Sequence, residues 1–262
     1  MDIRLDGRRA VVTGGTKGIG RGVVAEFLAS GADVVFCARN AEDVKQTEAT
    51  LVTEHPGRVV RGVVADVTDA ASIQSLMADA ADALRGIDVL VNNAGAAHPG
   101  TFEMLSDDDW HADLDVKLFS QIRATRAALP HLRRSSAPRV INVNAVYARY
   151  PDPAFFATTV NRAACLNLTK ALAQQYGPEN ILVNSVNIGF VVTAQWDNIH
   201  QRRAPELGKD EFFTSLAAAE VPLGRFGTVD EVSGLITFLA SDRGSYITGA
   251  SIDVAGGMGK YV

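Results

Sequence analysis

A glycine-rich turn near the start of the chain has the residue types and spacing of a phosphate-binding loop. It follows an apolar run that ends at Val12 and opens a helix-like stretch at Gly18. Glycines let a backbone approach a pyrophosphate closely, and the N-terminus of a helix favours the negative charge. A strand before the turn and a helix after it are the context that this motif requires. The turn therefore predicts a bound dinucleotide, with its phosphates held by Gly14, Thr16, Lys17, Gly18, Ile19 and Gly20.

The elements that position this turn alternate between short apolar runs and longer helix-like stretches. We expect strands at residues 10–12, 33–37, 59–64, 89–91, 140–143, 181–186 and 250–254, and helices at 18–30, 41–54, 69–85, 107–132, 155–176 and 229–240. Alternation of this kind predicts an α/β protein with a doubly wound parallel sheet of about seven strands, a Rossmann fold. No linker divides the chain, so residues 1–262 are expected to form a single domain. Ligands of such sheets bind beyond the carboxyl ends of the strands.

One long segment, residues 190–213, fits no strand of this pattern. It is polar and also carries aromatic side chains, namely Trp196, His200, Phe212 and Phe213. A long segment at the binding edge of a sheet favours a lid or substrate loop. An ordinary surface insertion is the alternative interpretation. The aromatic residues point to an apolar or aromatic small-molecule substrate.

Composition excludes several other classes of protein. The net charge of −5 argues against a nucleic-acid partner, and the small basic cluster of Arg133, Arg134 and Arg139 is interpreted as a solvated helix end and loop. The two cysteines, Cys37 and Cys165, lie in apolar surroundings and have neither metal-site nor disulfide spacing. No apolar run reaches the length of a signal sequence or a membrane span. We therefore expect a cytoplasmic protein that binds no metal and no membrane.

Several further motifs, in the same order, resemble the classical short-chain dehydrogenase/reductase family over essentially the whole chain. The matching segments are Asp66 after the third strand, Asn92-Asn93-Ala94-Gly95, Asn180-Ile181-Leu182-Val183-Asn184, Pro222-Leu223-Gly224-Arg225 and Tyr246-Ile247-Thr248-Gly249-Ala250. The resemblance implies a nicotinamide cofactor and hydride transfer to or from a carbonyl carbon. It also implies a dimer or tetramer built through the helices at 107–132 and 155–176 and through the last strand.

The resemblance places the choice of cofactor at the end of the second strand. An acid there would bind a ribose 2′-hydroxyl and repel a 2′-phosphate. This chain has Ala38 followed by Arg39, and Lys17 adds a second cation, so we predict NADP(H) rather than NAD(H). By the same resemblance the cofactor is also contacted by Asp66, Val67, Asn93, Ala94, Gly95, Arg162, Gly189, Val191 and Thr193.

The family's proton chemistry uses a tyrosine, a lysine four residues later, a serine and an asparagine. Aligned by the motifs, the tyrosine position holds Thr158, the lysine position Arg162, the serine position Ala145 and the asparagine position Lys117. Threonine is far less acidic than a phenol, and arginine does not release its proton. The usual route of proton transfer is therefore expected to be absent, and the catalytic residues stay open at this point.

Three interpretations follow. The first is an atypical oxidoreductase that acts on a carbonyl or alcohol with a substitute proton donor; the candidates are Tyr147, Tyr150, Asp152, His98 and Lys117. For each candidate, a packing, turn or surface role is the alternative. The second is an enzyme without net redox chemistry, an isomerase, dehydratase, cyclase or lyase, in which Lys117 and Arg162 stabilise an enolate or carboxylate. The third is a non-catalytic, cofactor-binding subunit in a mixed oligomer with an active relative.

Overall fold

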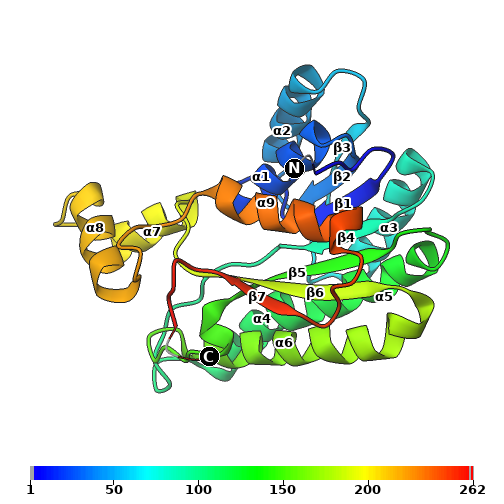
Figure 1. Ribbon diagram of the computed structural model, residues 1–262. Coiled ribbons are helices and arrows are strands. Elements are labelled where there is room, and N and C mark those ends of the chain that lie inside the picture. Colours follow the sequence, from blue (N-terminus) through cyan, green and yellow to red (C-terminus); the bar gives the residue numbers. More distant parts are fainter. Residues whose placement is uncertain (1–2, 260, 262) are drawn as a thin grey trace.

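Seven parallel strands form one sheet at the centre of the molecule (Figure 1). The computed structural model describes residues 3–259 and 261. The sheet order is β3-β2-β1-β4-β5-β6-β7. The chain adds strands toward one edge from β1 to β3 and toward the opposite edge from β4 to β7, so the order of the strands reverses between β1 and β4. The strands are β1 (Arg9–Thr13), β2 (Asp33–Ala38), β3 (Val60–Val64), β4 (Val89–Asn92), β5 (Arg139–Ala145), β6 (Leu182–Ile188) and β7 (Ser251–Val254). The predicted fold class is confirmed.

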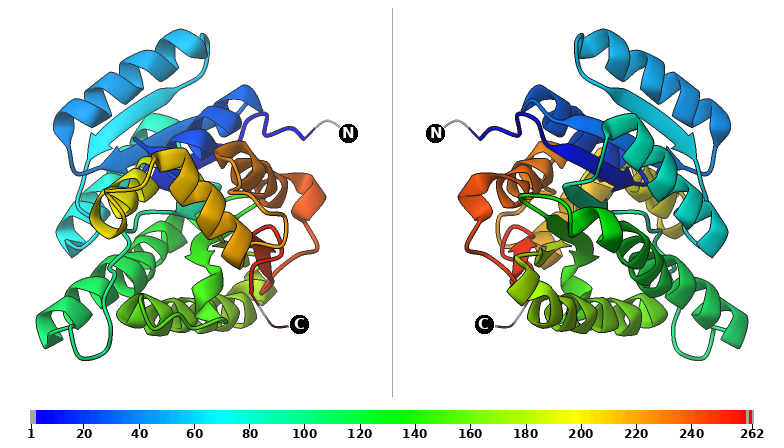
Figure 2. Two further views of the ribbon diagram at one scale, coloured as in Figure 1. Left: turned by 90° about the vertical axis from the view of Figure 1, so that its left-hand side faces the viewer. Right: turned by 90° about the vertical axis from the view of Figure 1, so that its right-hand side faces the viewer.

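Helices cover both faces of the sheet (Figure 2). The first face packs against α1 (Gly18–Ala29), α2 (Ala41–Glu54) and α9 (Val229–Ala240); the second packs against α3 (Ala70–Leu84), α5 (Ser120–Leu132) and α6 (Phe156–Tyr176). Alternate residues of one strand enter different cores, as Val11 and Val12 do. Since both faces are buried, the central strands are rich in valine, isoleucine and leucine.

Local capping signals explain where several helices begin. The side chain of Asn40 accepts a hydrogen bond from the backbone of Asp43 at the start of α2. Thr228 and Glu231 form a reciprocal capping box at α9, and Ser106 forms one with Asp109 at α4 (Asp107–Leu114). The helix starts expected at residues 41, 107 and 229 are therefore confirmed.

The helix expected over residues 107–132 is interrupted, which corrects the prediction of one continuous element. A π-helical turn, Asp115–Phe119, separates α4 from α5. The extra residue widens the backbone ring, and the freed carbonyl of Val116 accepts a hydrogen bond of 2.7 Å from Ser120 Oγ. Such turns occur often at functional sites. Here the turn carries Lys117.

The segment at 190–213 is helical, which corrects the expectation of a loop. It contains α7 (Ala194–Arg203) and the start of α8 (Lys209–Glu220), and both stand to one side of the sheet in Figure 1. A separate aromatic cluster supports them: Trp196 packs edge-on against Phe190 at 4.7 Å and against Phe226 at 5.0 Å between ring centroids. Phe226 is distant from Trp196 in the chain, and periodicity does not reveal their contact.

Burial confirms one expectation about individual residues and corrects another. Cys37 and Cys165 are free and buried, as their apolar surroundings predict. Arg139 is also buried, so the interpretation of a fully solvated basic cluster is wrong for this residue. In the described part of the chain, no helix is long and apolar enough to cross a membrane, and no cluster of histidine, cysteine and acidic side chains has the arrangement of a metal site.

Candidate functional site

A cleft of about 560 Å³ opens at the carboxyl ends of the strands, where the fold predicts a ligand. The segments after β1, β2, β4, β5 and β6 all reach it, together with α7. Most residues predicted to hold the cofactor line it: Gly14, Thr16, Lys17, Gly18, Ile19, Gly20, Arg39, Asn93, Ala94, Gly95, Arg162, Gly189, Val191 and Thr193. The structure thus brings residues from five parts of the sequence into one cavity.

Asp66 and Val67 are the two predicted cofactor residues that do not line this cleft. The carboxylate of Asp66 accepts hydrogen bonds from the backbone and the hydroxyl of Thr68, at 2.9 and 2.8 Å. These bonds hold the pKa of Asp66 below its usual value. Val67 is buried in the core under the second face of the sheet. Both residues shape the turn after β3, and their predicted adenine contacts stay predictions.

Close backbone approach explains the glycines of the turn. A Cβ on Gly20 would lie 2.1 Å from the carbonyl oxygen of Gly14, so no side chain fits there. Gly14 and Gly18 have positive φ angles of 70° and 52°, which favour glycine. The result is a smooth concave surface at the N-terminus of α1.

Asn93 fixes this turn to the end of β4. Its side-chain amide donates to the carbonyl oxygens of Thr13 and Gly14, at 2.9 and 3.1 Å. The hydroxyl of Thr13 in turn accepts from the backbone of Asn93 and of Ala94, both at 3.0 Å. The two segments of the cleft are therefore held in register before any ligand binds.

The two cations predicted to select the cofactor differ in their surroundings. Lys17 Nζ lies 2.6 Å from Asp43 Oδ2 at the start of α2, and its side chain is 65% exposed. Arg39 lines the cleft and has no carboxylate within ion-pair distance in the described residues. Among the residues that the structure describes, Arg39 thus has no competing carboxylate, whereas Lys17 has one in Asp43.

Arg162 crosses the inner end of the cleft from α6. Its Nη1 donates to the carbonyl oxygen of Val143 at 2.9 Å. Its Nη2 packs against Gly95, since a Cβ added to this glycine would lie only 3.0 Å from it. Its Nε is buried and has no hydrogen-bond partner in the described residues. A buried donor without a partner is costly, so this guanidinium is suited to an acceptor on a bound ligand.

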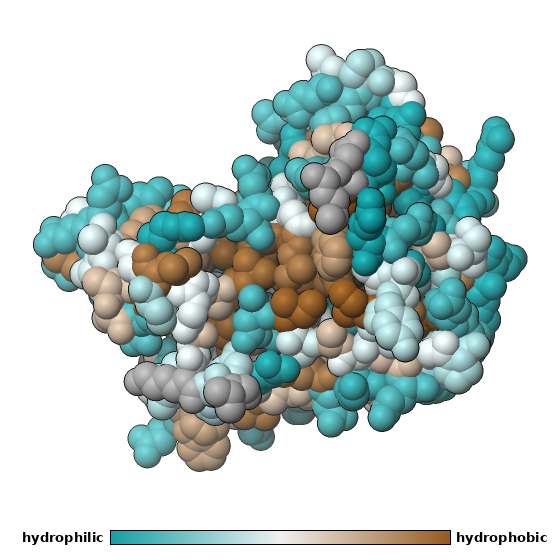
Figure 3. All heavy atoms as spheres, in the orientation of Figure 1, coloured by the Kyte–Doolittle hydropathy of each residue, from teal (hydrophilic) through white to brown (hydrophobic). Residues whose placement is uncertain are grey.

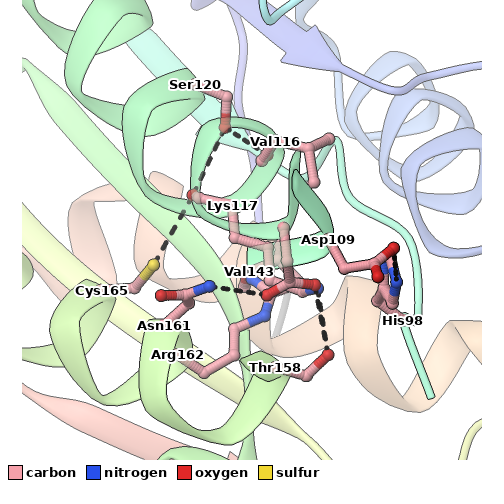
Figure 4. A network of polar contacts seen from close by, with 11 residues as sticks. His98, Asp109, Val116, Lys117, Ser120, Val143, Thr158, Asn161, Arg162 and Cys165 are labelled. Atoms are coloured by element: carbon pink, nitrogen blue, oxygen red, sulfur yellow. Dashed lines mark hydrogen bonds and ion pairs between the residues drawn. The ribbon is translucent and has the colours of Figure 1, made fainter. Parts of the chain in front are cut away.

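Beside Arg162, a buried polar cluster closes the inner wall of the cleft; we call Asp113, Lys117, Thr158 and Asn161 the Lys117 cluster. Lys117 Nζ forms an ion pair with Asp113 Oδ1 and donates to Thr158 Oγ1 at 3.1 Å. Asn161 donates to the other carboxylate oxygen of Asp113 at 2.8 Å. Figure 4 shows Thr158 and Asn161 on the side of α6 that faces Lys117. Lys117 and Thr158 are both among the residues that line the cleft, so the cluster borders the cavity.

The surroundings of Lys117 make it a stronger acid than a solvated lysine. Its side chain is only 1% exposed, and burial, followed by the positive charge of Arg162, lowers its pKa from the usual 10.5. The carboxylate of Asp113 acts in the opposite direction because it stabilises the charged form. An interpretation of Lys117 as a solvated surface residue is therefore wrong.

The other candidate proton donors lie in less suitable places. Tyr147 lines the cleft and stacks on Phe155 at 5.4 Å, but burial, and then the negative charge of Asp152, raise its pKa and make the phenol a weaker acid. His98 does not line the cleft and pairs with Asp109 at 3.2 Å. Tyr150 and Asp152 also lie outside the lining.

Ala145 lies in the cleft wall, and its methyl side chain offers no hydrogen bond. The wall beyond it, toward α7, is mainly apolar: Val146, Phe155, Phe190, Trp196, Ile199 and Met258. This part of the cleft suits an apolar group of a substrate.

Sequence reasoning missed Asp113 and Asn161. The spacing of Asp113 and Lys117, four residues apart on an expected helix, is a local signal for an ion pair. Asn161 carries no comparable signal because its contact with Asp113 joins segments 48 residues apart.

Comparison with known protein families agrees with this site and fold. A family model described as enoyl-(acyl carrier protein) reductase matches residues 14–259. A 3-oxoacyl-[acyl-carrier-protein] reductase of Aquifex aeolicus is 30% identical over 258 residues, which cover 98% of this chain and 100% of that protein. The chain belongs to the short-chain dehydrogenase/reductase family.

Solved structures of similar proteins extend the comparison. A short-chain oxidoreductase of Pseudomonas aeruginosa PAO1 with an atypical catalytic center is 36% identical in its apo form, with a TM-score of 0.93 over 99% of this chain and 100% of that chain. Its NADPH-bound form is 35% identical, with a TM-score of 0.92 over 99% of both chains. L-Sorbose reductase of Gluconobacter frateurii, complexed with NADPH and L-sorbose, is 28% identical, with a TM-score of 0.95 over 100% of both chains.

Proposed function

We propose that the protein is an NADP(H)-dependent oxidoreductase that interconverts a carbonyl compound and an alcohol, with Lys117 as a non-standard proton donor. The contact that carries this proposal is the 3.1 Å hydrogen bond from Lys117 Nζ to Thr158 Oγ1 in the wall of the cleft. It supplies an acidic group where the family positions hold neither tyrosine nor serine. A preference for small apolar substrates is supported by the apolar wall toward α7.

The cleft fits an NADP(H) molecule on three independent features. The glycine turn lines the cleft at the N-terminus of α1, where the helix N-terminus favours the negative charge of a pyrophosphate. Within residues 3–259 and 261, Arg39 has no ion-pair partner and Arg162 Nε has no hydrogen-bond partner. Arg39 thus offers a cation for a 2′-phosphate, and Arg162 Nε offers a donor for a ribose or nicotinamide oxygen. The similar oxidoreductase of P. aeruginosa binds NADPH, which agrees with the cofactor predicted from Ala38 and Arg39.

The chemistry needs one hydride and one proton. NADPH supplies the hydride to the carbonyl carbon when it is bound. Lys117 supplies the proton to the carbonyl oxygen, either directly or through the hydroxyl of Thr158. This hydroxyl accepts from Nζ and donates to Asp113 Oδ1 at 3.4 Å, and by rotating it can donate its hydrogen into the cleft instead. General acid catalysis of this kind contributes about 10²–10⁴-fold in rate.

The experiment that tests the proposal follows deuterium from labelled NADPH into product. The protein is incubated with a panel of aryl and alkyl ketones and aldehydes, and products are analysed by mass spectrometry. We expect one deuterium in an alcohol product, and a loss of about 10²–10⁴-fold in kcat for Lys117→Met. Lys170→Met, the same type of change at an exposed position of α6, is the control and should leave kcat unchanged.

Two other outcomes would replace the proposal. Turnover without consumption of NADPH would support non-redox chemistry based on Lys117 and Arg162. No turnover, with co-purification of an intact relative, would support a non-catalytic subunit.

We also infer that the protein forms a homo-oligomer, a dimer or tetramer. Figure 3 shows apolar side chains gathered over α9 and β7, and β7 is an edge strand. The partly buried apolar residues there are Leu235, Phe238, Ile252 and Val254. On the π-helical turn and α6, Phe119 and Val160 are exposed. Native mass spectrometry tests this; a monomer at micromolar concentration would contradict it. The cytoplasmic location stays a prediction.

A further inference from the structure

Asp113 is a buried carboxylate that the family resemblance does not assign to any role. Its side chain is fully shielded from solvent, and it projects from the last turn of α4 just before the π-helical turn. Both of its oxygens have partners: Lys117 on Oδ1 and Asn161, at 2.8 Å, on Oδ2. Thr158 Oγ1 donates to Oδ1 at 3.4 Å. Three polar side chains, one from the π-helical turn and two from α6, therefore converge on one carboxylate.

We propose that Asp113 is the positioning residue of the proton donor: it keeps Lys117 charged inside the cleft wall and aims its ammonium at Thr158, while Asn161 fixes the carboxylate. The proposal rests on the proposed function of Lys117 as the acid, and it adds the group that makes this acid available.

The charges that face Lys117 explain why such a residue is needed. Asp113 of α4 contributes a negative charge, Arg162 of α6 a positive charge, and Cys165 of α6 a thiol whose pKa is raised by burial. Without Asp113, the ammonium of Lys117 and the guanidinium of Arg162 would be buried close together without the carboxylate that now balances their charge. A buried charge without a partner is strongly destabilised, so the ammonium would lose its proton.

Rigid placement of the carboxylate is the task of Asn161. The amide of Asn161 occupies Oδ2, which leaves Oδ1 as the site for the ammonium. With its donors directed at Oδ1 and Thr158, the ammonium has a fixed orientation. A fixed donor reduces the reorganisation needed when charge develops on a substrate oxygen.

In the resulting reduction step the C=O π bond breaks, and new C–H and O–H bonds form. The hydride supplies both electrons for the C–H bond, and the oxygen takes the proton that Lys117 gives up, directly or through the Thr158 hydroxyl. NADPH is oxidised and the carbonyl is reduced. Lys117 is left neutral and regains a proton from solvent through the open cleft, while Asp113 stays ionised throughout.

A titration of the protein without cofactor tests the proposal independently of activity. The protein is labelled with ¹³C-lysine, and the Cε signal that disappears in Lys117→Met is followed with pH. Burial and Arg162 lower the pKa of Lys117 to about 6 when Asp113 contributes nothing, so in the unmodified protein we expect Lys117 to titrate clearly above this value. A Lys117 that titrates at or below pH 6 would overturn the proposal, and this measurement does not depend on whether any variant of Asp113 folds.

Substitution of Asp113 gives the second test. In Asp113→Asn the titration of Lys117 should move to lower pH by about one to three units, because the counter-ion is lost. Asp113→Glu should keep it near the original value. Asp115→Asn is the matched control, since Asp115 pairs with Arg123 instead and lies outside the cluster. An unchanged titration in a folded Asp113→Asn protein would contradict the proposal.

The kinetic readout separates positioning from a purely structural role. With a carbonyl substrate from the panel, Asp113→Asn should lose at least about tenfold in kcat at pH 7.5. The loss should shrink as the pH falls through the lowered pKa of Lys117 in this variant. A loss of the same factor at every pH would mean that Asp113 only supports the fold, and would overturn the proposal. If no substrate is reduced, the proposed function fails, whereas the titration still decides the role of Asp113.

Discussion

Lys117 Nζ and Thr158 Oγ1 lie 3.1 Å apart, although 41 residues separate them in the chain. The π-helical turn Asp115–Phe119 carries Lys117, and α6 presents Thr158 toward it. Both residues stand where the family resemblance leads one to expect other side chains. Because of this contact, a change in either side chain alters the surroundings of the other.

Thr158→Val removes the hydroxyl while it keeps the shape of the side chain. Lys117 Nζ then loses one acceptor, and a proton can reach the substrate only directly. We expect kcat for carbonyl reduction to fall by about 10- to 100-fold, with less effect on NADPH binding. Steady-state kinetics and a fluorescence titration measure the two quantities.

Thr158→Ser is the control because it retains the hydroxyl. It should keep kcat within about threefold of the original. Equal losses in the valine and serine variants would show that packing, not the hydroxyl, is responsible.

The direction of the pH dependence follows from the role of Lys117. Reduction requires the charged form, so kcat should be highest below the pKa of Lys117 and should fall as pH rises through it. Oxidation of the alcohol requires the neutral form and should rise over the same interval. Because burial and Arg162 lower this pKa, the fall should occur well below the usual 10.5 of lysine. Rate profiles in both directions check this, and a reduction rate that increases with pH would rule out Lys117 as the acid.

Local signals explain how much of the fold the sequence predicts. The bounds of α2 and α9 agree with the prediction because Asn40 and the Thr228–Glu231 pair act within four residues of each helix start. The helices α7 and α8 escaped prediction, and their lack of a side-chain cap does not explain this, since α1 and α6 also lack one and were predicted. Their order depends on contacts such as Trp196 with Phe226, which periodicity does not encode.

The candidate site also has one part that local sequence signals predict and one part that they do not. The glycine turn could be predicted because its residues are consecutive and each conformational demand is local. The Lys117 cluster could not, because burial decides its chemistry. A lysine in a sequence carries no sign that its side chain is 1% exposed beside a carboxylate. The π-helical turn that places it there is likewise set by packing between helices.

Asp43 should weaken the binding of NADPH. Its carboxylate pairs with Lys17 at 2.6 Å and lies at the end of the cleft that Arg39 also borders. In Asp43→Asn, Lys17 no longer has this carboxylate as a partner and can bind a 2′-phosphate, and the negative charge that repels the phosphate is removed. Exposed pairs contribute only about 0.2–1 kcal/mol, so we expect a gain of about two- to fivefold in NADPH affinity and little change for NADH. Glu42→Gln, which removes a neighbouring charge without an ion pair, is the control. Calorimetric titration of both cofactors measures the effect, and an equal gain for NADH would exclude a role in 2′-phosphate selection.

Trp196 should hold α7 over the cleft. Its ring contacts Phe190 and Phe226 and also lines the cavity, so it links the order of α7 to the shape of the substrate wall. In Trp196→Ala the lost packing costs about 3–5 kcal/mol of stability. This loss exceeds the local stability that we expect for the short segment around α7. We therefore expect α7 to open locally while the sheet stays folded, which is detectable as faster amide hydrogen exchange in residues 194–203. KM for the carbonyl substrate should rise at least about tenfold, since the apolar wall is lost.

Arg202→Ala, on the same helix but exposed, is the control and should change neither the exchange rate nor KM. Faster exchange throughout the sheet would contradict a local role for Trp196, because it would show that the aromatic cluster stabilises the whole domain.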